Sequence, residues 1–189
     1  MTEEEIDLLK RYTPFGGSVL EFGSGGSSSY FFEAGVKRLV SVESDKAWLG
    51  ALAQTPIINF FYKKNRWLPI HANIGPTREF GLPRSSIPRL SWLQYHQGCW
   101  SLMPDMNFDL ILIDGRFRVA CLCQSLLRCA NNNAVFIMHD FWPRQDYHCV
   151  LKLCSVIDQG GSSVVLKKKK RMNWRLLVNL LQAYQFSLD

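Results

Sequence analysis

A glycine-rich turn and a carboxylate beyond it are the part of this chain best suited to binding a ligand. Residues 18–22 form an apolar run that leads into a turn with glycine at Gly23 and Gly25, and a second apolar run, 38–43, ends in Glu43. At the tips of adjacent parallel strands, such glycines let main-chain groups approach a ligand, and such an acid accepts hydrogen bonds from ribose hydroxyls. The spacing therefore predicts a nucleoside site.

The same turn indicates that the nucleoside carries no phosphates. A dinucleotide-binding turn has a third glycine, which lets the next helix pack closely beneath a pyrophosphate, and this chain has Ser28 at that position. An NAD-dependent oxidoreductase is therefore an alternative that the sequence disfavours. Hydroxyl groups at positions 27–29 can cap the helix that follows, so that its amide groups point into the pocket.

Composition limits the class of protein. The chain has 189 residues, of which 47% are hydrophobic, so we expect one domain spanning residues 1–189 with a substantial core. It contains no apolar stretch of the roughly 20 residues that a transmembrane helix needs, and its acidic start lacks the features of a signal peptide. We predict a cytoplasmic protein whose six cysteines are reduced core thiols, because none forms a CxxC pair.

The net charge of +6 comes mostly from one segment. Lys167, Lys168, Lys169, Lys170 and Arg171 contribute five positive charges in a row. Such a run is usually a solvated surface, but it can also bind the phosphates of nucleic acid or a membrane surface. A non-catalytic domain that contacts nucleic acid or a membrane through this basic tail is therefore a second alternative.

Apolar runs and turn signals alternate along the chain, as in α/β proteins. Thr2 and Glu5 have the spacing of a capping box, so the first helix is expected to begin at once. The long irregular stretch 73–107 is expected to be a lid or substrate loop. Strands are expected at residues 18–22, 38–43, 67–72, 108–113, 134–138, 155–158 and 163–167, and helices at 3–11, 28–34, 45–53, 116–130, 144–154 and, as a basic C-terminal helix, about 167–186.

This order of elements predicts an α/β fold with a doubly wound, mostly parallel seven-stranded sheet. Strands that alternate with helices run parallel, because the chain returns through each helix before it starts the next strand. The last two strands are instead joined by the hairpin signal at residues 159–162. We therefore expect one antiparallel edge strand.

With these elements in place, the chain resembles the class I methyltransferases that use S-adenosylmethionine. The residues Glu21-Phe22-Gly23-Ser24-Gly25 match the first motif of that family, and Glu43 matches its ribose-binding acid. The segment 71–74 falls where the family contacts adenine, and 113–118 matches the end of its fourth strand. The resemblance implies a small-molecule acceptor and S-adenosylmethionine bound by Glu21, Gly23, Ser24, Gly25, Glu43, Asn73, Ile74 and Asp114.

Further segments narrow the resemblance. Residues 73–77, 114–118 and 139–141 are similar to a group of small bacterial-type members and to the catechol- and macrocin-type O-methyltransferases. This likeness implies methyl transfer to oxygen and a Mg²⁺ ion held by Asp114 and Asp140, because carboxylates after the fourth and fifth strands hold magnesium in those enzymes. The chain departs from the catechol type by having His139-Asp140 in place of an Asp-Asn pair.

Asp114 and His139 are the candidates for catalysis. Asp114 ends a central strand, where open α/β sheets bind ligands, and it could hold a metal or position the acceptor; alternatively it caps the next helix. His139 could act as the general base, since a neutral imidazole accepts a proton near pH 7, or it could be structural. Three arginines near the same edge would suit an acidic or phosphorylated acceptor, or could simply be solvated: Arg116, Arg118 and Arg144.

The irregular stretch 73–107 leaves two further expectations. Its aromatic side chains Trp92, Tyr95 and Trp100 could close over a substrate or pack in the core. So long an insert in a short chain also suggests a homo-oligomer, in which a partner subunit completes the pocket.

Overall fold

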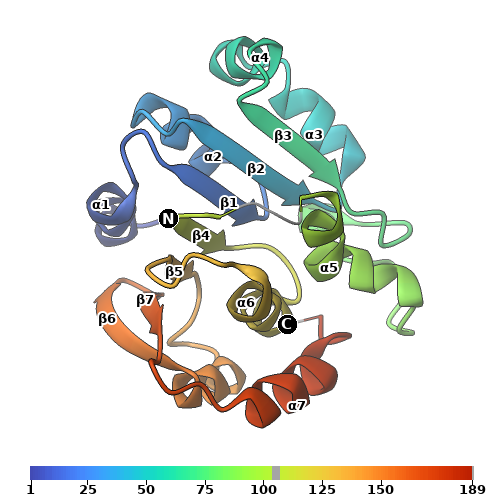
Figure 1. Cartoon of the computed structure of the whole chain (residues 1–189). Helices are drawn as coiled ribbons and strands as arrows, with labels where there is room; N and C mark the ends of the chain where they lie inside the picture. The colour runs from blue at the N-terminus through green and yellow to red at the C-terminus, as the bar shows by residue number, and fades with distance from the viewer. Residues whose placement is uncertain (104–106, 189) are drawn as a thin grey trace.

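The chain folds around one seven-stranded sheet, seen obliquely in Figure 1. The computed structural model describes residues 1–103 and 107–188. The strand order is β3-β2-β1-β4-β5-β7-β6, and all neighbouring pairs are parallel except β5–β7 and β7–β6. The predicted fold is confirmed, and the reversed strand β7 lies one place inside the edge strand β6. The strands are β1 (Ser18–Phe22), β2 (Arg38–Glu43), β3 (Trp67–His71), β4 (Leu110–Ile113), β5 (Val135–Met138), β6 (Cys154–Gly160) and β7 (Ser163–Lys168).

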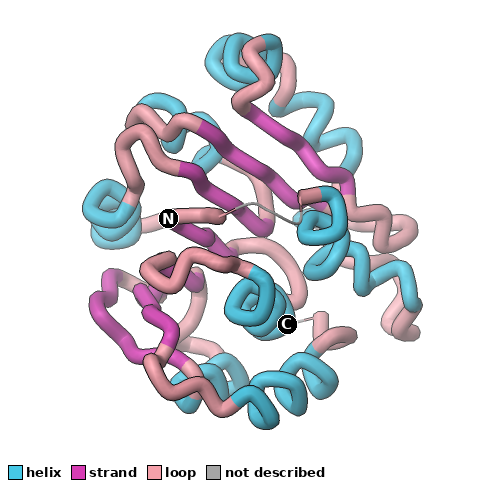
Figure 2. Tube along the Cα trace, viewed as in Figure 1, coloured by secondary structure: helices cyan, strands magenta, loops and turns pink. Residues whose placement is uncertain are grey.

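Helices cover both faces of the sheet, as the cyan segments of Figure 2 show. One face carries α1 to α4, and the other carries α5 to α7 with a 3-10 helix at Gln145–Lys152. The capping box predicted for the first helix is present, with Thr2 and Glu5 bonded to each other's main chain. The helices are α1 (Glu3–Tyr12), α2 (Gly26–Glu33), α3 (Lys46–Leu52), α4 (Pro56–Lys63), α5 (Leu93–Leu102), α6 (Arg118–Arg128) and α7 (Trp174–Tyr184).

The central strands are buried on both faces, which explains their nearly continuous apolar sequences. In β1, Val19 packs against α1 to α4, whereas Leu20 and Phe22 pack against the helices of the other face. The polar residue Glu21 follows the same alternation and faces the side on which α2 begins. The six cysteines are free, as expected, and five of them are buried.

Three segments differ from the expected elements. Helix α4 lies in a stretch for which no element was predicted, and α5 lies inside the stretch 73–107 that was expected to be irregular; residues 104–106 of that stretch are outside the described part. The C-terminal helix begins at Trp174 rather than near residue 167, because Lys167 and Lys168 complete β7 by pairing with Ser155 and Cys154.

The basic run lies far from the end of the sheet at which ligands are expected. Lys167 pairs with Val135 at the start of β5, whereas Val164 pairs with Met138 at the end of that strand. Since β7 is reversed, the lysines lie at the amino ends of the parallel strands. Within residues 1–103 and 107–188, every helix is too short or too polar to traverse a lipid bilayer.

Candidate functional site

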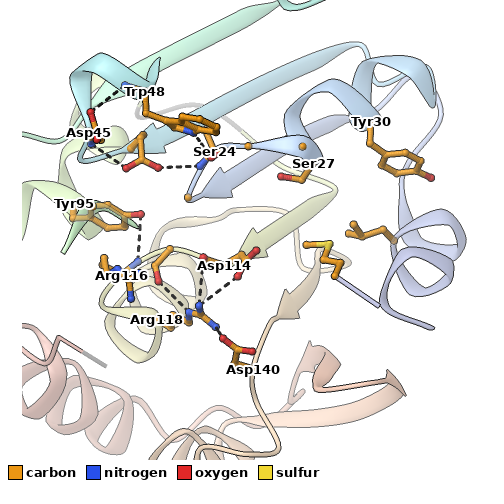
Figure 3. A pocket seen from close by; sticks show the side chains of 18 of the residues that line it. Ser24, Ser27, Tyr30, Asp45, Trp48, Tyr95, Asp114, Arg116, Arg118 and Asp140 are labelled. Atoms are coloured by element: carbon orange, nitrogen blue, oxygen red, sulfur yellow. Dashed lines mark hydrogen bonds and ion pairs between the residues drawn. The ribbon is translucent and has the colours of Figure 1, made fainter. Parts of the chain in front are cut away.

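A cavity of about 950 Å³ opens at the carboxyl ends of β1, β2 and β4 (Figure 3). This is the edge at which open α/β sheets bind ligands. One wall is the turn after β1, with Glu43, Asp45 and Trp48 beside it, and the opposite wall carries the residues that follow β4 and β5. The lining comprises Met1, Ile6, Leu9, Gly23, Ser24, Gly25, Gly26, Ser27, Tyr30, Glu43, Asp45, Trp48, Glu79, Gly81, Tyr95, Asp114, Gly115, Arg116, Arg118, Asp140 and Arg144.

Glycine is required in the turn at Gly23. Its φ of +90° is rarely adopted by other residues, and a Cβ there would lie 2.7 Å from Cα of Gly115 at the end of the adjacent strand. Gly25 differs, because its backbone is extended and a Cβ there would meet open space. Gly23 therefore shapes the turn, whereas Gly25 keeps the cavity open in front of it.

Glu43 lies at the tip of β2 with its carboxylate on the cavity wall. Oε2 accepts a hydrogen bond from the main-chain N–H of Ser24 at 3.2 Å, and Oε1 accepts bonds from the main-chain N–H groups of Ser44 and Asp45 at 2.7 and 3.0 Å. These bonds fix the carboxylate and tie the glycine turn to β2. The side chain predicted to bind ribose is thus held on the cavity wall.

The glycine turn also presents an unsatisfied hydroxyl group. Ser24 Oγ is buried, with no hydrogen-bond partner among the described residues. The carbonyl oxygen of Ser24 accepts a hydrogen bond of 2.8 Å from Nε1 of Trp48, so the indole lies beside the turn (Figure 3). A buried hydroxyl without a partner is costly unless a ligand or water satisfies it, so Ser24 supports the prediction that a polar ligand binds here.

Glu21, predicted to bind the cofactor, lies behind the turn rather than on the cavity lining. It is fully buried and accepts hydrogen bonds from the hydroxyls of Ser27, Ser28 and Ser41. Burial raises the pKa of Glu21 to about 7, although the three hydroxyl groups oppose that rise. Glu21 therefore positions the turn and the start of α2.

The two residues predicted to contact adenine, Asn73 and Ile74, are also outside the lining. Asn73 is exposed and accepts a bond from the N–H of Gly75, while Ile74 is buried in the core. The chain turns inward after β3, so the cavity is instead reached by Glu79 and Gly81 a few residues later. Sequence reasoning missed both of these residues.

Asp114 and Asp140 do come together, as predicted, but with an arginine between them. The Arg118 guanidinium lies 3.4 Å from Asp114 Oδ1 and 3.1 Å from Asp140 Oδ2, as the dashed lines of Figure 3 trace. Arg118 is almost fully buried, and its positive charge fills the role that a magnesium ion would have. No group of three or more metal ligands occurs in the part of the chain that the structure describes. These residues therefore do not fit a Mg²⁺ site.

His139, predicted to be the general base, lies behind Asp114 and outside the lining. Its Nε2 is 3.1 Å from a carboxylate oxygen of Glu5, and its Nδ1 is 3.2 Å from one oxygen each of Asp114 and Asp140. Both ring nitrogens thus face carboxylates. The arrangement makes His139 a partner of Asp114 rather than a group that meets a substrate directly.

The acids around His139 ionise differently. Burial raises the pKa of Glu5, but hydrogen bonds from Ser162 and Thr2 outweigh it and lower the pKa to about 2. Burial also raises the pKa of Asp114, and here His139 and Arg118 offset it only in part, so the pKa stays above its ordinary value. Asp114 is therefore the member of the group that most readily holds a proton.

Of the three aromatic residues in the predicted lid, only Tyr95 reaches the cavity. Tyr95 lies on α5, and its hydroxyl accepts a hydrogen bond of 3.3 Å from the main-chain N–H of Arg116. Trp92 and Trp100 are buried in the core. The helical spacing of the buried residues in α5 was a signal that could have revealed this element.

The cavity is also lined by α1 and by residues after β4 and β5. Ile6 and Leu9 of α1 and Tyr30 of α2 supply apolar surface, and Arg116 and Arg144 supply positive charge. The arginines were expected at this edge, whereas the contribution of α1 was not. An amphipathic first helix gives no sign in the sequence of which cavity it will border.

Comparison with known proteins gives the fold. No family model and no curated protein matches the sequence. Similar solved structures include a methyltransferase-like protein from Silicibacter pomeroyi, with a TM-score of 0.78 and 22% identity over 100% of this chain and 96% of that chain. A ribosomal protein L11 methylase from Lactobacillus delbrueckii subsp. bulgaricus has a TM-score of 0.55 and 14% identity over 87% of this chain and 76% of that chain. A methyltransferase from Geobacter sulfurreducens has a TM-score of 0.53 and 13% identity over 90% and 81%. The chain therefore has the class I fold of S-adenosylmethionine-dependent methyltransferases.

Proposed function

We propose that this protein transfers a methyl group from S-adenosylmethionine to an oxygen atom of a small molecule. The observation that carries the proposal is the shared wall formed by the Gly23 turn and Glu43, which are hydrogen-bonded to each other at the edge of the cavity. An acid at the tip of β2 suits a ribose with two free hydroxyls. A turn without a third glycine suits a nucleoside without phosphates.

The residues of this wall fit the parts of the cofactor. Glu43 would accept hydrogen bonds from the ribose hydroxyls, and Ser24 Oγ would gain the partner that it otherwise lacks. Gly25 leaves space in front of the turn for the methionine part. Trp48, beside the turn, offers an apolar face to the adenine ring.

S-adenosylmethionine, when bound, supplies a methyl group on a positively charged sulfur. Attack by the acceptor oxygen forms a carbon–oxygen bond, and the carbon–sulfur bond breaks to leave a neutral thioether. The protein must align the two reactants and take up the hydroxyl proton. Asp114 lines the cavity and has a raised pKa, so it is suited to accept that proton. Behind it, His139 and Arg118 stabilise the carboxylate.

The lining of the cavity also favours a small acceptor. Helix α1 contributes the apolar side chains Ile6 and Leu9 to the same cavity as Asp114. One of the similar structures is a ribosomal protein methylase, so a macromolecular acceptor is the competing possibility. The basic run from Lys167 to Arg171, which would suit nucleic acid, lies at the other end of the sheet.

Calorimetric titration with S-adenosylhomocysteine, and separately with NAD, tests the cofactor. We expect micromolar binding of S-adenosylhomocysteine alone, weakened about 100-fold or more in Glu43→Ala because two ribose hydrogen bonds to a charged group are lost. Glu33→Ala, which changes an exposed glutamate of α2, is the matched control and should bind as the wild type does. Binding of NAD but not S-adenosylhomocysteine, by a protein with a normal unfolding transition, would refute the proposal.

A further inference from the structure

The segment between β7 and α7 is strongly basic and takes no part in the proposed methyl transfer. We propose that this segment and the outer face of α7 bind the surface of a bilayer that contains anionic phospholipids. The inference does not depend on the proposed function, because it concerns a surface remote from the cavity. It makes the protein one that rests on a membrane without crossing it.

The charge of this part of the chain is of one sign. Residues 159–188 contain no aspartate and no glutamate. Asp158, just before them, pairs with Arg11 of α1 at 3.1 Å. Among residues 1–103 and 107–188, none of the cations of the segment forms an ion pair with a carboxylate. These cations are Lys167, Lys168, Lys169, Lys170, Arg171 and Arg175.

Contacts at both ends of the segment hold these cations in place. The Nζ of Lys168 lies 5.0 Å from the ring centre of Trp174 at the start of α7. The Nζ of Lys169 donates to two main-chain carbonyl oxygens at the end of the 3-10 helix Gln145–Lys152, at 2.8 and 3.4 Å. In Figure 1 the segment runs below β6 and β7 into α7.

The cations that share this surface can now be defined. Lys167 is left out, because successive residues of a strand face opposite sides of the sheet and Lys168 is the one that faces α7. Lys152 is added, because it is exposed and its carbonyl oxygen accepts the bond from Lys169. The basic surface comprises Lys152, Lys168, Lys169, Lys170, Arg171 and Arg175.

Exposed apolar side chains lie among these cations. Trp174 is 50% exposed and Val178 is 42% exposed, and the two lie one turn apart on α7. Val156 of the edge strand β6 is also exposed. It pairs with Leu166, two residues before Lys168, so Val156 and Lys168 lie on the same face of the sheet. The surface thus combines positive charge with apolar groups.

A bilayer interface matches this combination better than a nucleic acid does. Lysine and arginine side chains attract anionic headgroups, and each raises the affinity about fivefold. An indole ring is suited to the boundary between headgroups and acyl chains. A nucleic acid would bind the same cations but offers little apolar surface to Val156 and Val178. The inner face of α7 packs on the core, so the helix lies on the bilayer with its outer face.

Binding in this orientation leaves the cavity accessible. Lys167 pairs with Val135 at the start of β5, which places the segment at the amino ends of the parallel strands. The cavity opens at their carboxyl ends, beside Gly23 and Glu43. A protein that rests on lipid through the basic surface therefore points its cavity toward water.

Sedimentation of the full chain with lipid vesicles tests the inference. We expect it to bind vesicles with about 30% phosphatidylserine at least tenfold more tightly than pure phosphatidylcholine vesicles at about 0.1 M salt, and to lose this binding at about 0.5 M. Replacing Lys170→Gln together with Arg171→Gln should weaken binding about 25-fold. Trp174→Ser should weaken it about tenfold while the salt dependence stays the same.

A second double variant is the matched control. Lys63→Gln together with Lys64→Gln removes two exposed positive charges at the end of α4, beside strand β3 at the opposite edge of the sheet. It lowers the net charge by the same amount and should bind the vesicles as the wild type does. Both double variants change exposed side chains, so their unfolding temperatures should equal that of the wild type.

The outcomes that would overturn the inference are distinct. Wild-type protein that ignores both vesicles, or binds them equally, does not recognise anionic lipid, and this comparison needs no variant. An equal loss in the α4 control would show that net charge, and not this surface, attracts the protein. Tighter binding of a labelled RNA or DNA than of anionic vesicles, lost in the variant of Lys170 and Arg171, would assign the surface to nucleic acid. None of these results depends on S-adenosylhomocysteine binding.

Discussion

A carboxylate oxygen of Glu5 lies 3.1 Å from Nε2 of His139, although 134 positions separate the two residues in the chain. Glu5 is also the capping residue of α1, and it accepts hydrogen bonds from the N–H and the hydroxyl of Ser162 in the hairpin between β6 and β7. The first helix is thereby attached to the histidine whose other ring nitrogen faces Asp114. One buried acid thus joins the N-terminal helix, the last hairpin and the candidate catalytic group.

Acid should destabilise the protein through Glu5. Its pKa is about 2 when folded and about 4.5 when unfolded, so the unfolded chain binds more protons between these values. Stability on the order of 3 kcal/mol is therefore present above pH 4.5 and lost as the pH falls toward 2. Urea unfolding between pH 3 and pH 7 should show a shallower acid slope for Glu5→Gln than for wild type. Glu33→Gln is the control. An unchanged slope in Glu5→Gln would show that folding does not lower the pKa of Glu5.

Glu21 should have the opposite pH dependence. Its pKa is about 7 when folded, against an ordinary value of 4.5, so the folded protein binds more protons and stability falls as the pH rises from 4.5 to 7. Glu21→Gln resembles the protonated side chain and keeps an oxygen that can accept bonds from the serines. We therefore expect Glu21→Gln to be more stable relative to wild type at pH 8 than at pH 5, as measured by thermal unfolding. Equal differences at the two pH values would show that Glu21 is ionised in the folded protein.

Two glycines of the turn should respond differently to alanine. At Gly23 the backbone has φ +90° and a Cβ would lie 2.7 Å from Gly115, so Gly23→Ala should lose about 2 kcal/mol or more of stability. At Gly25 the backbone is extended and the space is open, so Gly25→Ala should unfold at the wild-type temperature but bind S-adenosylhomocysteine more weakly. Calorimetry and thermal unfolding of both variants test this. Normal cofactor binding by Gly25→Ala would place the ligand elsewhere.

Methyl transfer should depend on Asp114. Asp114→Asn removes the proton acceptor but retains the shape of the side chain, so kcat is expected to fall about 100-fold or more. S-adenosylhomocysteine affinity should change only slightly, because in the proposed site Glu43 and the glycine turn would supply most of the cofactor contacts. Single-turnover assays with an acceptor identified by screening small hydroxyl-bearing molecules give the rate. A rate within about threefold of wild type would exclude Asp114 as the base.

Chelation should leave the protein unaffected. Arg118 lies between Asp114 and Asp140, where it supplies the positive charge that a magnesium ion would otherwise supply. We expect the unfolding temperature and the affinity for S-adenosylhomocysteine to be the same in EDTA and in MgCl₂. A clear rise in either with Mg²⁺, lost in Asp140→Asn, would mean that Arg118 moves aside for the ion.

Much of the fold was predictable because its signals are local. The limits of β1 and β2 follow from apolar runs that end in a glycine turn and in an acid, and the capping box of α1 follows from Thr2 and Glu5. Helix α5 was missed although its buried residues have helical spacing, because polar residues and Gly98 interrupt that pattern. Its buried side chains pack against α6 and the sheet, and that packing rather than local preference stabilises it.

The sequence by itself determined the mostly parallel α/β sheet, the glycine turn and the acid at the tip of β2, because each depends on neighbouring residues and on the periodicity of strands. Only the tertiary structure decided which charged groups meet. Asn73 turned away from the cavity, Glu5 reached His139, and Arg118 lay between two carboxylates that were expected to hold a metal. Such contacts join elements far apart in the chain, so they depend on how each helix packs against the sheet, which no local pattern specifies.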